Sequence, residues 1–178
     1  MIKTKLITLL VLASILFFSV SLKNISTESK DVYLSDITES NIVNSAPSIQ
    51  MYFYIKKYAA EFNIPEAYAF SLAYQETRYG GPMHLSYNHK QESYAGALGP
   101  MQIMPATGRY MLGRPISKND LISDIATNVY ISMKLLRHLH DRYSDWGLVF
   151  GAYNTGRPCV NQYSRNILNK EYIWKEVS

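Results

Sequence analysis

The sequence has little that would support covalent or metal-based stabilisation. Its 178 residues include one cysteine, Cys159, so no intrachain disulfide can form and stability must come from an apolar core. The four histidines fit no standard ligand set, since His84 and His89 share a polar loop while His138 and His140 point to different faces of a helix. No recognisable serine, cysteine or histidine nucleophile pattern is present. The sequence therefore predicts neither a metal nor a cofactor.

Sustained strand alternation and internal repeats are also missing, and no dense basic stripe marks a nucleic-acid surface. The formal net charge is +4, and the part from residue 47 onward carries the same net charge. A mildly basic domain suits an acidic polymer, although a solvated mixed surface explains the charge equally well. What remains are helical patterns of apolar residues, so the predicted class is mainly α.

The first 21 residues have the pattern of an export signal. Lys3 and Lys5 precede the almost wholly apolar run Leu6–Leu22, in which Ser19 and Ser21 are small enough for cleavage after Ser21. A retained membrane anchor is the alternative, because a spanning helix needs roughly 17–20 apolar residues and this run lies at that limit. Both alternatives predict an exported chain in the periplasm or cell envelope, with membrane contact only through this segment.

Composition divides the rest of the chain in two. Residues 22–46 are rich in Ser, Thr, Asn and Asp and are interpreted as a polar linker. The folded domain is expected over 47–178. Its first helix is predicted to be capped by Ser48 and to end near Asn63. Its second is predicted to open at Pro65, to run to Arg78 or Tyr79 and to stop at Gly80-Gly81-Pro82. A further helix is predicted over about 100–111. Ser123 or Asp124 is expected to cap a long helix that ends near 142, and Asp145 to cap a helix over about 146–153, with one or two helices after it.

Glu76 has the clearest catalytic potential. It lies in the last turn of the second predicted helix, among aromatic and aliphatic neighbours. The partial negative charge of a helix C-terminus disfavours a carboxylate by about 0.3–1 kcal/mol, and partial burial adds to this. Both effects favour a neutral acid near neutral pH, as protonation of a glycosidic oxygen requires. From position alone, a solvated surface glutamate is the alternative.

Three motifs follow one another along the chain. They are Glu76-Thr77; the stretch Gly96-Ala97-Leu98-Gly99-Pro100-Met101-Gln102-Ile103-Met104-Pro105-Ala106-Thr107; and Ala152-Tyr153-Asn154. In order and approximate spacing this set resembles the soluble lytic transglycosylase (SLT) family, whose lysozyme-like enzymes cut the glycan strands of bacterial peptidoglycan. The resemblance covers about residues 50–177 and implies a lysozyme-like helical domain with a substrate cleft.

The resemblance also implies site residues. Glu76 matches the family's single catalytic acid and base, and Asn154 matches the residue that orients an N-acetyl group. The expected substrate-binding residues are Thr77, Gly99, Met101, Gln102, Tyr153, Asn154 and a late tyrosine, for which Tyr172 fits the pattern better than Tyr163.

Each of these residue types suits a sugar cleft. Gly99 lets the backbone approach a sugar, Gln102 hydrogen-bonds a hydroxyl or N-acetyl group, and Met101 packs on a sugar face. Tyr153 either holds Glu76 in position or lines the cleft. Met104 is expected in the core.

The chain departs from the family pattern at three places. Thr77 replaces the usual Ser, and Pro100 replaces the usual Leu and removes one backbone donor. The loop from Glu76 to Gly96 is also longer than we expect for the family. Its candidates for an additional cleft wall are Tyr87, Asn88, His89 and Tyr94.

The resemblance implies a one-carboxyl mechanism. Glu76 protonates the oxygen between N-acetylmuramic acid (MurNAc) and N-acetylglucosamine (GlcNAc), then activates the muramyl 6-hydroxyl, whose attack on C1 gives a 1,6-anhydro sugar. One alternative is a lysozyme-type hydrolase in which Glu92 serves as the second carboxylate. The other is a peptidoglycan-binding component of an envelope-spanning secretion or conjugation machine. The expected partners are glycan strands, with such a machine as a further candidate, and the sequence leaves the oligomeric state open.

Overall fold

The computed structural model describes residues 41–175, without the side chains of 171–173 and 175. The predicted leader, 1–21, and most of the predicted linker, 22–46, lie outside the described residues. The helices α2 to α8 belong to one compact unit, Val43–Ser178. Gln50 donates hydrogen bonds to the carbonyls of Val43 and Ser45, so this end of the predicted linker is tied to the first long helix.

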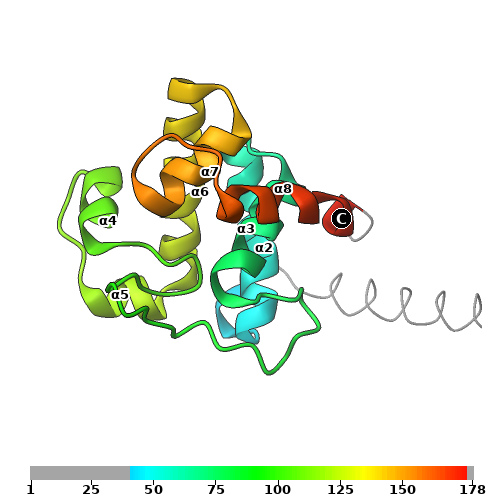
Figure 1. Ribbon diagram of the computed structural model, residues 1–178. Helices are drawn as coiled ribbons and strands as arrows, with labels where there is room; N and C mark the ends of the chain where they lie inside the picture. The colour runs from blue at the N-terminus through cyan, green and yellow to red at the C-terminus, as the bar shows by residue number, and fades with distance from the viewer. Residues whose placement is uncertain (1–40, 176–178) are drawn as a thin grey trace, which may run out of the picture. The chain divides into compact units, whose positions relative to one another are not determined.

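The described part of the chain is helical, which confirms the predicted class (Figure 1). Within residues 41–175, extended pairing is limited to two isolated bridges, Glu92 with Leu98 and Leu98 with Ile103. None of the described helices has both the length and the apolar character to cross a bilayer. In chain order the elements are η1 (Ile42–Asn44), α2 (Pro47–Glu61), α3 (Glu66–Thr77), α4 (Pro105–Leu112), α5 (Lys118–Ser123), α6 (Ile125–Tyr143), α7 (Trp146–Thr155) and α8 (Gln162–Lys175).

Side-chain caps set the start of three helices. Asp124 and Asp145 accept backbone amide hydrogen bonds at the starts of α6 and α7, as predicted from their positions. The short helix α5, which sequence patterns miss, begins with a capping box formed by Ser117 and Asp120. Its six residues are too few for a visible apolar period, so only the capping residues signal it.

The ends of α2 and α3 differ from the prediction. Ser48 does not cap α2; it lies inside the helix, fully buried, and its hydroxyl donates to the Pro82 carbonyl at 2.9 Å. Helix α3 ends at Thr77 because Arg78 adopts a left-handed conformation, with φ of 60°. The helix is therefore stopped before Gly80, and Glu76 remains in its last turn.

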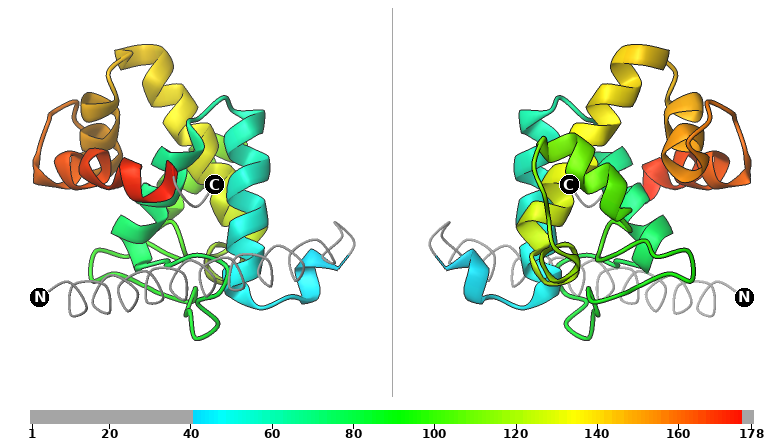
Figure 2. Two further views of the ribbon diagram at one scale, coloured as in Figure 1. Left: turned by 90° about the vertical axis from the view of Figure 1, so that its right-hand side faces the viewer. Right: turned by 90° about the vertical axis from the view of Figure 1, so that its left-hand side faces the viewer.

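Helix α8 packs along α3 and α7, while α6 packs against α2 and α7 (Figure 2). Three stacked rings join α8 to α3: the Phe70 ring lies 5.2 Å from that of Trp174 and 6.2 Å from that of Tyr79. All three side chains are buried. Such stacks add about 0.5–1.5 kcal/mol per pair to the burial of their area, so α8 is firmly held on α3.

Candidate active site

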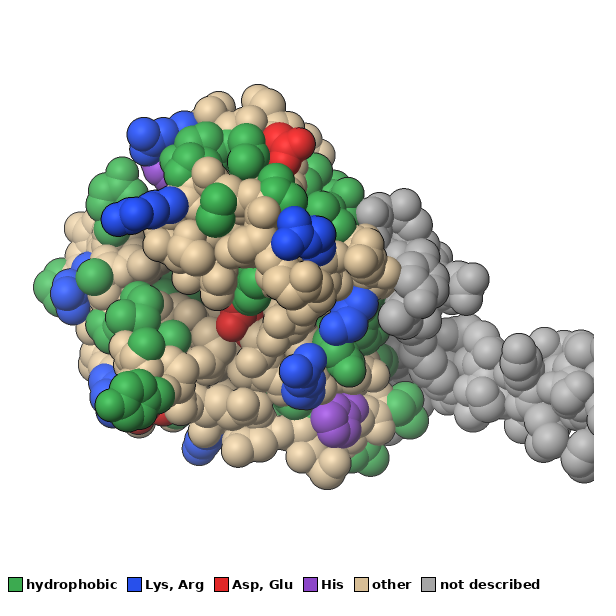
Figure 3. Space-filling view, viewed as in Figure 1, with side chains coloured by type: hydrophobic (Ala, Val, Ile, Leu, Met, Phe, Trp, Pro, Cys, Tyr) green, Lys and Arg blue, Asp and Glu red, His purple; other side chains and the backbone are tan. Residues whose placement is uncertain are grey.

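Glu76 is partly buried at the end of α3, and Tyr163 of α8 donates a hydrogen bond to its Oε1. Burial raises the pKa of the Glu76 carboxyl to about 7, and the bond from Tyr163, which favours the ionised form, offsets only part of this rise. Figure 3 shows an acidic side chain recessed in a hollow on one face of the molecule. A carboxyl that titrates near neutrality can both give a proton and take one back.

Of the two late tyrosines, the structure places Tyr163 against Glu76. The resemblance to the family pattern predicts Tyr172 instead. The side chain of Tyr172 lies outside the described residues. Burial and the nearby charge of Glu76 raise the pKa of Tyr163 well above its usual range, so its hydroxyl stays protonated and acts as a donor.

Tyr153 of α7 lies near Glu76 but bonds to other groups. Its hydroxyl donates to the Met101 carbonyl at 2.8 Å and lies 3.0 Å from Ser132 Oγ. Burial, followed by the charge of Glu76, raises the pKa of Tyr153 well above its usual range. Its hydrogen bonds therefore hold the Met101 turn, while its ring lines a groove described below.

The Gly96–Gln102 motif forms a tight turn in place of the predicted helix start. Gly99 and Gln102 have φ of 74° and 51°, and Gln102 Nε2 donates to the Gly99 carbonyl at 2.9 Å. These positive φ values cannot continue into a helix, so α4 begins only at Pro105. A Cβ on Gly99 would lie 2.2 Å from the Leu121 carbonyl oxygen, so the close approach of the turn to α5 requires glycine here.

Asn128 of α6, which sequence analysis missed, holds this turn through its side-chain amide. Its side chain is fully buried; Nδ2 donates to the carbonyls of Leu98 and Leu121 at 2.9 and 2.8 Å, and Oδ1 accepts from the Met101 amide at 2.9 Å. Buried hydrogen bonds of this kind fix one geometry, because leaving any partner unpaired is costly. The shape of the turn is therefore set by α6.

Two residues expected to bind substrate are interior. Thr77 is 4% exposed; its hydroxyl donates to the Pro100 carbonyl at 2.8 Å and lies 2.6 Å from Tyr87 Oη. Met101 is 0% exposed and belongs to the core. These side chains hold the loop and the turn against α3, which corrects the expectation that they meet a sugar. Tyr87 is buried as well and forms no cleft wall.

Asn154 lies at the edge of an open groove of about 610 Å³ between α4, α6 and the end of α7. Asn154 is exposed, and Asn161 Nδ2 approaches its Oδ1 at 3.5 Å. Met104, expected in the core, is 42% exposed and lines this groove. The other groove residues include Thr107, Tyr110, Leu135, His138, Leu139, Arg142, Tyr143 and Tyr153.

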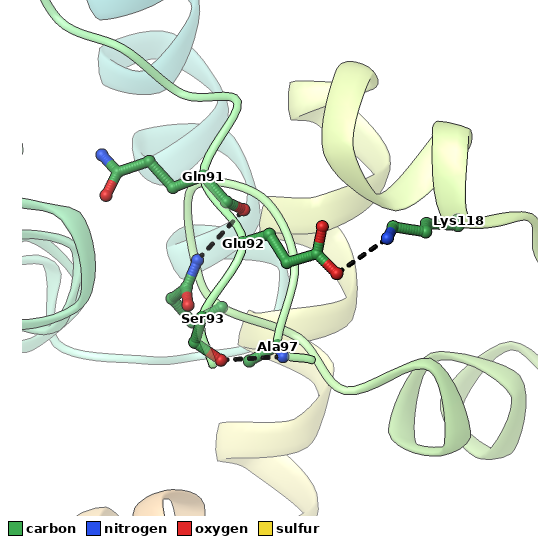
Figure 4. Close-up of polar contacts among 6 residues, drawn as sticks. Gln91, Glu92, Ser93, Ala97 and Lys118 are labelled. Atoms are coloured by element: carbon green, nitrogen blue, oxygen red, sulfur yellow. Dashed lines mark hydrogen bonds and ion pairs between the residues drawn. The ribbon is translucent and has the colours of Figure 1, made fainter. Parts of the chain in front are cut away.

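Glu92 is turned toward α5, where its carboxylate forms an ion pair with Lys118 at 2.7 Å (Figure 4). Both side chains are largely exposed. The surrounding loop is closed by Ser93 Oγ, which accepts from the Ala97 amide at 2.9 Å. Among the described residues, no three His, Cys, Asp or Glu side chains form a group that could hold a metal ion.

The comparisons with known proteins agree with one another. The family model described as the transglycosylase SLT domain matches residues 53–174. The chain is 32% identical over 117 residues to the soluble lytic murein transglycosylase of Escherichia coli (strain K12), an alignment that covers 62% of this chain and 17% of that protein.

Two solved structures are similar to the described fold. The lytic transglycosylase Slt of Pseudomonas aeruginosa, solved as an inactive Glu-to-Gln mutant, has a TM-score of 0.59 and 20% identity over 70% of this chain and 24% of its own. The 70 kDa soluble lytic transglycosylase of Escherichia coli has a TM-score of 0.50 and 27% identity over 66% of this chain and 19% of its own. The chain thus corresponds to less than a quarter of the length of each relative, and the lysozyme-like helical expectation is confirmed.

Proposed function

Because this chain belongs to the SLT transglycosylase domain family, we propose that it is a peptidoglycan lytic transglycosylase. It cleaves the β-1,4 bond between MurNAc and GlcNAc and leaves 1,6-anhydroMurNAc ends. The observation that carries the proposal is Glu76, a partly buried carboxyl with a pKa of about 7 and a tyrosine hydroxyl bonded to it.

Glu76 acts first as an acid and then as a base. Its proton passes to the glycosidic oxygen while the C1–O bond breaks and GlcNAc leaves as an alcohol. The carboxylate then takes the proton of the muramyl 6-hydroxyl as that oxygen bonds to C1, so Glu76 returns to its starting form and no water is consumed. A pKa near the working pH serves both steps, and the internal nucleophile needs no second catalytic group.

The groove beside Asn154 is suited to the glycan strand. Its walls combine tyrosine rings with a few polar groups, the composition expected of a sugar-binding cleft. In this proposal Asn154 orients an N-acetyl group, and Gln102 is a second amide side chain that can hydrogen-bond the sugar. Gln102 uses Nε2 within the turn, and its Oε1 has no hydrogen-bond partner among the described residues.

The released sugars test the proposal. Digestion of purified peptidoglycan in H₂¹⁸O should yield anhydro products that are lighter by one water than reducing-end products and carry no ¹⁸O. Reducing ends labelled with ¹⁸O would instead indicate a lysozyme-type hydrolase. Binding to wall sacculi without either product would point to a peptidoglycan-binding component of an envelope-spanning machine.

We expect Glu92→Gln to keep activity within about twofold, because an exposed ion pair contributes only about 0–1 kcal/mol and Glu92 faces Lys118. Release of labelled fragments from sacculi measures this. Lys118→Gln is the matched control, since it breaks the same pair from the other side. A loss of tenfold or more for Glu92→Gln alone would favour the two-carboxyl hydrolase.

We expect Tyr163→Phe to shift the pH profile. The Glu76 acid must be protonated, so activity falls as the pH rises through about 7. The bond from Tyr163 lowers the pKa of Glu76; its removal raises that pKa, and the alkaline limb of kcat/KM should move to higher pH by about 0.5–1 unit. Tyr130→Phe is the control, because this tyrosine packs against Tyr58 and Phe62, away from the groove, and the limb should stay in place. If the alkaline limb stays at the same pH or moves to lower pH, Tyr163 does not set the ionisation of Glu76.

We also propose that the chain is exported and acts in the cell envelope. The support is the charged start and apolar run of residues 1–21, together with the location of the proposed substrate. The N-terminal mass of the protein in membrane and soluble fractions distinguishes a cleaved leader from a retained anchor.

A further inference from the structure

A fully buried serine, Ser132, lies on the same face of α6 as Asn128, four residues earlier. Asn128 bonds directly to the turn, since it accepts from the Met101 amide at 2.9 Å. A serine inside a helix commonly bonds the carbonyl four residues back. Among the described residues, Ser132 Oγ instead meets Tyr153 Oη of α7, at 3.0 Å. The serine hydroxyl therefore joins two helices.

The direction of this hydrogen bond follows from the number of protons. Tyr153 Oη carries one proton, which it donates to the Met101 carbonyl at 2.8 Å. The proton in the 3.0 Å contact must then come from Ser132. Burial and the charge of Glu76 raise the pKa of Tyr153, and the Ser132 bond acts against this rise, as a donor to the tyrosine oxygen does. Such a donor also strengthens the bond that Tyr153 itself makes.

These two bonds lead to the peptide unit between Met101 and Gln102. Its carbonyl accepts from Tyr153, and its N–H donates to the Gly99 carbonyl at 3.1 Å. Rotation of this unit changes the φ of Gln102, which is 51°, a left-handed value that a residue with a side chain rarely adopts. Hydrogen bonds at both edges of the unit therefore keep Gln102 in this conformation and set the direction in which its side chain leaves the backbone.

We propose that Ser132 is a positioning residue for sugar binding: its hydroxyl orients Tyr153, and Tyr153 holds the turn that carries Gln102. This inference rests on the proposed function, in which Gln102 hydrogen-bonds the sugar. The same hydroxyl fixes the Tyr153 ring, which lines the groove beside Asn154. Ser132 itself is 0% exposed, so it acts on the substrate only through these neighbours.

The test measures kcat and KM of the full-length chain for anhydro-sugar release from soluble, uncrosslinked glycan strands. Ser132→Ala removes only the hydroxyl oxygen. We expect it to raise KM about threefold to tenfold, the effect of one buried hydrogen bond, and to change kcat by less than about twofold. The proton transfers by Glu76 proceed as before. A purely structural role would have the opposite signature, because partial unfolding lowers the amount of active enzyme, and so kcat, without changing KM.

Tyr153→Phe provides the second measurement, because it removes the hydroxyl through which Ser132 acts. We expect Tyr153→Phe to raise KM by itself, and the further change Ser132→Ala in that background to alter KM by less than about twofold.

Ser71→Ala is the matched control. Ser71 is equally buried in a helix, but its hydroxyl has no hydrogen-bond partner among the described residues, so this variant should leave KM and kcat unchanged. If Tyr153→Phe does not fold, the comparison of Ser132→Ala with Ser71→Ala still tests the inference.

An unchanged KM in Ser132→Ala would overturn the inference, as would an equal rise in Ser71→Ala. So would a rise in the Tyr153→Phe background as large as in the unchanged chain, or a loss confined to kcat. Absence of anhydro products from the unmodified chain would instead contradict the proposed function itself.

Discussion

Glu76→Gln is expected to lower kcat/KM for anhydro-sugar release by about 10³-fold or more, the size of effect of a general acid and base. Gln is nearly the same size and can still accept the hydrogen bond from Tyr163, but it cannot donate and recover a proton. Glu66→Gln, at the start of the same helix, is the control and should retain activity. Mass spectrometry of the released sugars measures both. If Glu76→Gln still releases anhydro products at a substantial rate, Glu76 is not the catalytic acid and base.

The same variant should be more stable than the unchanged protein at high pH. The folded pKa of Glu76, about 7, lies above its ordinary value of 4.5. An acid with a raised pKa stabilises the folded state at low pH, and this contribution is lost as the pH rises through 4.5 to 7. Gln does not ionise, so the two proteins should be equally stable near pH 4, and Glu76→Gln should be more stable by about 1–3 kcal/mol near pH 8. A variant that is less stable at pH 8 would contradict the burial of the carboxylate.

Asn128→Ala is expected to lower the free energy of unfolding by about 3–4 kcal/mol, because three buried backbone groups lose their partner. Activity should fall as well, since the Met101–Gln102 turn is no longer fixed from α6. Urea unfolding and kcat/KM on sacculi measure the two effects. Asn119→Ala, an exposed asparagine on α5, should change stability by less than about 0.5 kcal/mol. A comparably small loss for Asn128→Ala would mean that the turn holds its shape by itself.

Local sequence signals predict the helices and the place of Glu76 well. The apolar periods of α2, α3 and α6, and the caps Asp124 and Asp145, depend on neighbours within a few residues, which a sequence displays directly. The end of α3 is off by only a residue or two, because Arg78 takes the left-handed conformation that glycine usually provides.

The site is harder to predict where a residue's role depends on distant contacts. Asn128 looks like any polar residue in an amphipathic helix, and only the folded turn shows that its amide has three partners. Met101, expected to face a sugar, is buried, and Met104, expected in the core, is exposed. The chain changes direction between them because Gln102, a non-glycine residue, adopts a positive φ. Tyr163 reaches Glu76 through the path of α8, which no sequence spacing specifies.

The hydrogen bond between Glu76 and Tyr163 joins residues 87 positions apart, so it can form only after α8 has been synthesised. A chain synthesised only as far as α7 contains the acid but not its hydroxyl partner. It also lacks Trp174, whose ring stacks on Phe70 and holds α8 against α3. The acid therefore gains its hydroxyl partner only when α8 has docked on α3, so the docking of the last helix is the step that completes this site.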